Sequence, residues 1–145
     1  MPGIIVGVDD SANAQHVLDW ATREAGILHA DLTVMTVVPT IVSQWTGQPL
    51  HYAGAEDAVE KARQAAQDKV AKSTSASDEP QPPSITVQAF DGSPAQALID
   101  ASRAADLVVV GARGSGGFTS LMLGSVSTQV AHHAACPVVI VPAGR

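Results

Sequence analysis

The chain has few aromatic residues, a single cysteine and little positive charge, and each shortage excludes a class of protein. Only 3% of the 145 residues are aromatic, whereas 46% are hydrophobic, so aliphatic side chains must fill the core. One cysteine, Cys136, excludes an internal disulfide and agrees with a reducing compartment. We therefore expect a cytoplasmic protein with a core of Ala, Val, Leu and Ile.

The charge balance and the hydrophobic runs exclude two kinds of partner. Lys and Arg together number 8 and Asp and Glu 14, which gives a net charge of -6. Nucleic-acid binding needs clustered Lys and Arg, and the three lysines, Lys61, Lys69 and Lys72, all lie in one stretch. No apolar run approaches the ~20 residues that cross a membrane. We expect neither nucleic acid nor a membrane as a partner.

Hydrophobic spacing predicts strands that alternate with helices along the chain. Short apolar runs predict strands at residues 4–8, 32–38, 85–90 and 107–110 and at Val138–Val141. Apolar residues at helical spacing predict helices at residues 12–29, with Ser11 as the N-cap, and at residues 125–135. An Ala-rich charged segment predicts a helix from 55 to about 72, and Ser93-Pro94 is a helix start signal.

Such alternation indicates an α/β fold in which helices cover both faces of a five-stranded parallel sheet, a three-layer sandwich. We expect residues 1–145 to form one domain. Right-handed crossovers leave two common strand orders, 3-2-1-4-5 and 2-1-3-4-5, and the spacing does not choose between them.

Ligands of open α/β sheets bind beyond the carboxyl ends of the strands, where the strand order reverses. The first predicted strand ends in Gly7-Val8-Asp9-Asp10-Ser11. The fourth is followed by a loop with glycine at four of its first seven positions, 111, 114, 116 and 117. Clustered glycines indicate unusual dihedral angles or close approach of the backbone to another group.

The glycine-rich loop leads to a helix start at Gly124-Ser125, where backbone N–H groups and the helix dipole favour an anion. Val126 and Ser127 belong to the same first turn. The loop is not a Walker loop, because Gly117-Phe118 stands where Lys-Ser/Thr is required. A dinucleotide fingerprint would follow the first strand, where this chain has Asp9-Asp10-Ser11.

The spacing Gly111-x2-Gly114-x9-Gly124-Ser125 resembles the pattern of the ATP-binding universal stress proteins. Gly7-Val8-Asp9-Asp10-Ser11 is similar to their first-strand signature, and Cys136-Pro137 with Val138–Val141 is similar to their last strand. Family members often have Gly where this chain has Asp10. The resemblance spans essentially the whole chain. It implies strand order 3-2-1-4-5, an adenine-nucleotide site for ATP, and a homodimer. Mg²⁺ commonly accompanies triphosphates. An apolar edge strand at Val138–Val141 favours self-pairing, so we expect the dimer to form there.

By that resemblance, Asp9 after Gly7 would bond the ribose or adenosine side of the nucleotide, and the Val38 backbone would contact adenine. Gly111 and Gly114 would let ribose and phosphates approach the main chain. The terminal phosphates would be bound by Gly124, Ser125 and Val126, with Ser127 in the same turn. Arg113 is a candidate phosphate contact. No side chain is assigned a catalytic role or a metal.

Several alternatives stay open at this point. The same site would serve a slow ATPase or phosphotransferase, but no lysine is near the glycine-rich loop in the sequence and no base is evident. A receiver-like phosphoacceptor domain would use Asp91 but lacks a lysine after the last strand. A dimeric interaction module without nucleotide is a further reading. We expect Trp45 to cover the core and Cys136 to be a buried, inert thiol.

Overall fold

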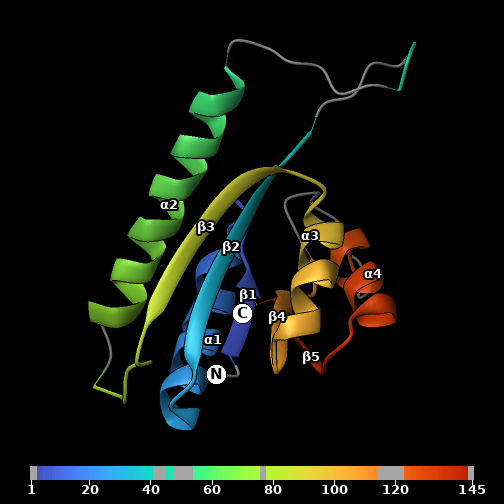
Figure 1. Ribbon diagram of the computed structural model, residues 1–145. Helices are drawn as coiled ribbons and strands as arrows, with labels where there is room; N and C mark the ends of the chain where they lie inside the picture. Colours follow the sequence, from blue (N-terminus) through green and yellow to red (C-terminus); the bar gives the residue numbers. More distant parts are fainter. Residues whose placement is uncertain (1–2, 41–44, 48–53, 76–77, 114–122, 144–145) are drawn as a thin grey trace.

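Five parallel strands pair in the order β3-β2-β1-β4-β5 in the computed structural model, which describes residues 3–40, 45–47, 54–75, 78–113 and 123–143 (Figure 1). The strands are β1 (Gly3–Gly7), β2 (Asp31–Pro39), β3 (Ile85–Gly92), β4 (Leu107–Gly111) and β5 (Val138–Val141). The helices are α1 (Ala14–Leu28), α2 (Ala55–Ser75), α3 (Pro94–Ala101) and α4 (Ser125–His133), and a 3₁₀ turn spans Ser102–Ala104. The predicted α/β sandwich and the order 3-2-1-4-5 are confirmed.

Alternating side chains of the central strands build a separate core on each face of the sheet. Val109 packs with Leu18 of α1 and Ala66 of α2 on one face. Its neighbour Val108 packs with Leu98 of α3 and Val130 of α4 on the other. β1 and β4 are apolar throughout because both of their faces are buried, as in other parallel sheets.

The strand order creates a switch point between β1 and β4. The chain runs outward from β1 through β2 to the edge strand β3, and then crosses back to β4 on the other side of β1. β1 pairs with β2 from Gly3 to Gly7, so it ends level with Met35, while β2 continues to Pro39. The longer β2 therefore forms a wall beside the carboxyl end of β1.

The start of α3 agrees with its local signal in the sequence, whereas the start of α1 does not. Ser93 caps α3 as predicted: its hydroxyl oxygen accepts a hydrogen bond from the Gln96 N–H at 3.2 Å, and Pro94 is the first helical residue. The predicted cap at Ser11 is wrong. α1 begins later, after Asn13, and the Ser11 N–H instead donates to Asp9 Oδ1 at 2.9 Å. The Asp9 carboxylate holds a turn that delays the helix.

Two expectations about single side chains are also wrong. Trp45 does not cover the core, since 96% of its surface is exposed. Cys136 is half-buried rather than buried. In the part of the chain that the structure describes, we find no helix with the length and apolar character of a membrane span.

Candidate functional site

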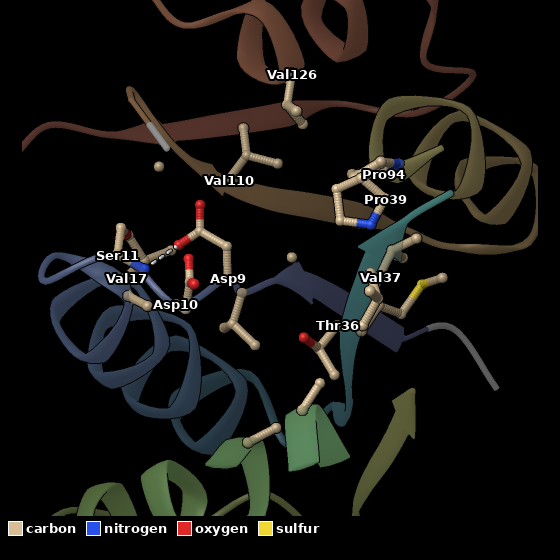
Figure 2. Close-up of a pocket in the computed structure, with 18 of the residues that line it drawn as sticks. Asp9, Asp10, Ser11, Val17, Thr36, Val37, Pro39, Pro94, Val110 and Val126 are labelled. Atoms are coloured by element: carbon tan, nitrogen blue, oxygen red, sulfur yellow. Dashed lines mark hydrogen bonds between the residues drawn. The ribbon is translucent and has the colours of Figure 1, made fainter. Parts of the chain in front are cut away.

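A cavity of about 670 Å³ lies beyond the carboxyl ends of β1 and β4, at the switch point (Figure 2). Its size falls within the ~300–1,000 Å³ typical of small-molecule sites. Its walls come from the ends of β1, β2 and β4, the starts of α1 and α3, one face of α2 and the first turn of α4. Elements far apart in the sequence thus meet around one space.

The residues predicted to bind a ligand gather at this cavity. Nine of the ten line it: Gly7, Asp9, Val38, Gly111, Arg113, Gly124, Ser125, Val126 and Ser127. The tenth, Gly114, lies outside the described residues. The convergence follows from the strand order, because β1 and β4 are neighbours in the sheet and the loops that follow them open at the same edge.

Asp9 and Asp10 bring negative charge to the β1 side of the cavity. Both residues line it, and Figure 2 shows the Asp9 carboxylate bonded to the backbone of Ser11 in the turn before α1. That bond uses one oxygen of Asp9, so the carboxylate keeps further lone pairs for a ligand hydroxyl. The β1 side is therefore suited to accept hydrogen bonds from a polyol.

Gly7 and Gly111 are small because neighbouring elements pack against them. A β-carbon on Gly7 would stand 2.8 Å from Leu98 Cδ1 of α3. One on Gly111 would stand 3.1 Å from Val17 Cγ2 of α1. Both glycines therefore allow helices to approach the strand ends closely, in addition to lining the cavity. The group that approaches each of these two glycines in the structure is therefore a side chain of a packed helix.

The first turn of α4 is tied to the end of β4. The Gly124 N–H donates to the Ala112 carbonyl at 2.7 Å. The hydroxyl of Ser127, which is buried, lies 2.9 Å from the same carbonyl and 3.0 Å from the carbonyl of Gly124. These bonds hold the two ends of the glycine-rich segment together and fix the start of α4 at the cavity. The first N–H groups of a helix have no partner within the helix, so this turn can donate to an anion.

Sequence reasoning missed the contribution of α2. Lys61 and Lys69 line the cavity, although the sequence analysis expected no lysine near the glycine-rich loop. With four alanines they form one face of α2: Ala58, Lys61, Ala62, Ala65, Ala66 and Lys69. These positions recur at spacings of three and four residues in an Ala-rich helix, and this pattern marks them as one helix face. It was not informative alone, because which face of α2 looks toward the strand ends depends on how the helix packs.

The described walls of the cavity have more positive than negative charge. Lys61, Lys69 and Arg113 line it together with Asp9 and Asp10. Three of the chain's 8 Lys and Arg residues are thus found here, against two of its 14 Asp and Glu residues. In a protein of net charge -6 this local excess favours an anionic ligand. Among the described residues no three His, Cys, Asp or Glu side chains are grouped to hold a metal ion.

An open parallel α/β sheet with a ligand-sized cavity at its switch point defines a class of small-molecule-binding proteins. The model of the universal stress protein family matches residues 2–142, and the chain belongs to this family. A universal stress protein of Mycolicibacterium smegmatis is 37% identical over 139 residues, which are 96% of this chain and 47% of that protein. One from Mycobacterium tuberculosis is 36% identical over the same shares. The chain spans about half the length of the curated relatives it matches.

Solved structures of the family share the fold at low sequence identity. UspA of Lactobacillus plantarum superposes with a TM-score of 0.75 at 22% identity, with 97% of both chains covered. A universal stress protein in complex with cAMP gives 0.68 at 24% identity, with 97% of this chain and 96% of that one covered. One from Archaeoglobus fulgidus in complex with dAMP gives 0.63 at 20%, with 97% of both covered.

Proposed function

We propose that this chain is a stress-response or regulatory protein that binds an adenine nucleotide, ATP in particular, in the cavity at the ends of β1 and β4. The observation that carries the proposal is the convergence of nine predicted binding residues on one cavity of about 670 Å³. Two proteins of the same fold form complexes with adenine nucleotides, cAMP and dAMP, which supports the choice of base.

The cavity has a wall suited to each part of the nucleotide. Asp9 at the end of β1 would accept hydrogen bonds from the ribose hydroxyls. Val38, near the end of β2, would meet the adenine through its backbone. Gly111, at the end of β4, and Gly114 beyond it would let the ribose and phosphates approach the main chain. Each of these roles rests on the family resemblance and on the position of the residue in the fold.

The phosphates would lie at the first turn of α4, against Gly124, Ser125 and Val126. The Ser127 hydroxyl bonds backbone carbonyls, so we expect this residue to contribute its N–H rather than its side chain. Arg113 at the cavity wall would add positive charge. Mg²⁺ usually keeps several waters and is held by one or two carboxylates together with substrate phosphates. Asp9 and Asp10 fit that donor set, so a Mg²⁺ ion would enter with the triphosphate.

A charge placed at the start of α4 tests the assignment. Ser125→Asp puts a carboxylate in the first helical turn, where it favours the helix but repels phosphate. The matched control is Gln129→Glu, which adds the same charge one turn further along α4, away from the cavity. By calorimetry of nucleotide-stripped protein with Mg²⁺, we expect micromolar ATP binding, a free energy of about -8 kcal/mol. Ser125→Asp should weaken it at least about ten-fold by charge repulsion.

The control should bind like the wild type. Absence of ATP binding to the wild-type protein would contradict the proposed function. Equal binding by Ser125→Asp and Gln129→Glu would place the phosphates elsewhere in the cavity.

The remaining predictions concern association and turnover. β5 is an edge strand, paired with β4 on one side, and its apolar sequence supports a homodimer through Val138–Val141. Light scattering of Val139→Lys beside the wild type would test this, since a buried lysine at the interface should yield monomers.

We expect slow ATP hydrolysis at most. Turnover of about 1 s⁻¹ would instead favour the phosphotransferase alternative. A cytoplasmic location stays a prediction.

A further inference from the structure

The cavity-facing side of α2 combines small alanine side chains with long, charged lysine side chains. Between Ala58 and Lys69 its cavity-lining positions are occupied by four alanines and two lysines. Alanine projects a single methyl group, so this face leaves room beside the strand ends. The lysines are eight residues apart, about 12 Å along the helix axis at 1.5 Å per residue. Long flexible side chains therefore flank a shallow stretch that a ligand can occupy.

Lys69 is the better anchored of the two lysines. Its carbonyl accepts a hydrogen bond from Gln15 Nε2 of α1 at 3.0 Å, which fixes this turn of α2 against the start of α1. Its side chain is half-buried and lines both the main cavity and a second cavity of about 320 Å³. The two cavities also share Ser11 and Ala65, so they adjoin at Lys69.

Among the described residues the ammonium groups of Lys61 and Lys69 have a weak ion-pair partner or none, so their positive charge can attract a ligand. Within the described residues no ion pair includes Lys69. Lys61 lies 3.3 Å from Asp57, but both side chains are more than two-thirds exposed. Exposed pairs of this kind are weak and exchange readily for a stronger anion. Both lysines are therefore available to a polyanion in the cavity.

We propose that Lys61 and Lys69 make this site select nucleotides by the charge of their phosphates, favouring the triphosphate over the monophosphate and the uncharged nucleoside. This inference rests on the proposed function, and it identifies the preferred ligand of the same site. The Coulomb attraction between a lysine and the ligand grows with the number of phosphate charges, while contacts to adenine and ribose are common to all three ligands. Removing a lysine should therefore change the preference among ligands and leave nucleoside affinity unaltered.

The experiment compares ATP, AMP and adenosine by calorimetry for wild type, Lys61→Gln, Lys69→Gln and the double variant. Glutamine resembles lysine in helix propensity, so α2 should be retained, and circular dichroism will check this. Lys72→Gln is the matched control, because it removes the same charge one turn further along α2 and lines only the smaller cavity. We expect the double variant to lose about ten-fold in ATP affinity, about three-fold for AMP and nothing for adenosine.

The wild-type preference for ATP over adenosine should also fall as the salt concentration rises from 50 to 200 mM, and fall less in the double variant, because salt screens these charges. Equal losses for ATP and adenosine, or equal losses in Lys72→Gln and Lys69→Gln, would overturn the inference and leave adenine binding established. A wild-type protein that binds none of the three ligands would overturn both the inference and the proposed function.

Discussion

Gln15 of α1 donates a side-chain hydrogen bond to Ser73 Oγ of α2 at 3.0 Å, across 58 residues of chain. The same amide lies 2.9 Å from Asp19 Oδ1 and 3.0 Å from the Lys69 carbonyl, and the Ser73 hydroxyl donates to Asp19. This network joins the helix that begins at the cavity to the helix that forms its lysine-bearing wall. It is built from polar groups because α1 and α2 meet near the surface, where these side chains satisfy one another.

Ser73→Ala should destabilise the protein and loosen the α2 wall. The buried hydroxyl both accepts from Gln15 and donates to Asp19, so its removal takes one hydrogen bond from each of them and leaves α2 tied to Gln15 through the Lys69 carbonyl alone. We expect the free energy of unfolding in urea to fall by about 1–2 kcal/mol. The control Ser75→Ala, at the exposed end of α2, should change it by less than about 0.5 kcal/mol. Equal stability of the two variants would exclude a structural role for the network.

Gly7→Ala should strain the packing between β1 and α3. The added methyl group would meet Leu98 Cδ1 at 2.8 Å, and Leu98 is itself buried in the core. We expect a loss of about 1–3 kcal/mol in thermal or urea unfolding, the usual cost of overpacking. Leu98→Val in the same chain should recover part of the loss, which a double-mutant cycle would show as a coupling energy above about 0.5 kcal/mol. If the two substitutions have additive effects on the free energy of unfolding, the strain at Gly7 arises from a contact other than the one with Leu98.

Ser127→Ala should weaken both the fold and nucleotide binding, although the Ser127 hydroxyl itself is not expected to touch the ligand. Without this hydroxyl the Ala112 and Gly124 carbonyls lose a donor, and the start of α4 is less firmly held to β4. We expect unfolding free energy to fall by about 1 kcal/mol and ATP affinity to fall several-fold. Ser125→Ala, at an exposed position in the same turn, is the comparison for stability and should be close to neutral. A Ser127→Ala protein of wild-type stability would contradict this assignment.

Cys136 should react slowly with alkylating agents near neutral pH. Partial burial, and then the nearby Asp106 carboxylate, raise the pKa of the thiol, whereas a backbone hydrogen bond from Val108 acts in the opposite direction. The folded protein therefore holds less thiolate at pH 8 than the unfolded chain does. The associated stability is present below the thiol pKa of the unfolded chain and is lost as pH rises through the folded pKa.

We expect iodoacetamide to modify native protein at pH 8 more slowly than protein unfolded in urea. Asp106→Asn should speed the native reaction, while Asp78→Asn, an exposed change elsewhere on the surface, should not. A native rate equal to the unfolded one would show that the burial has no effect on this thiol.

The expectations that succeeded depend on neighbours along the chain. The strands at residues 107–110 and Val138–Val141 were recognisable because strands buried on both faces are apolar throughout. Ser93-Pro94 specified the start of α3, because the capping bond joins residues three apart. Gly7 and Asp9 were candidates because they lie where the first strand ends. The family resemblance supplied the strand order, which is confirmed, and the roles of Gly111 and Gly124, which stay predictions. The cap at Ser11 failed because Ser11 belongs to a turn closed by the Asp9 carboxylate, and the helix begins only after Asn13.

The sequence by itself determined where strands and helices form and which segments carry glycine and acidic residues at strand ends. These properties follow from side-chain periodicity and capping, which act over a few residues. Only the tertiary structure decided that α2 turns Lys61 and Lys69 toward the cavity, that Ser127 bonds the end of β4, and that Trp45 stays outside the core. These outcomes depend on packing between distant segments, such as the contact of Gln15 with Ser73, and no local pattern specifies which face of a helix such contacts turn inward.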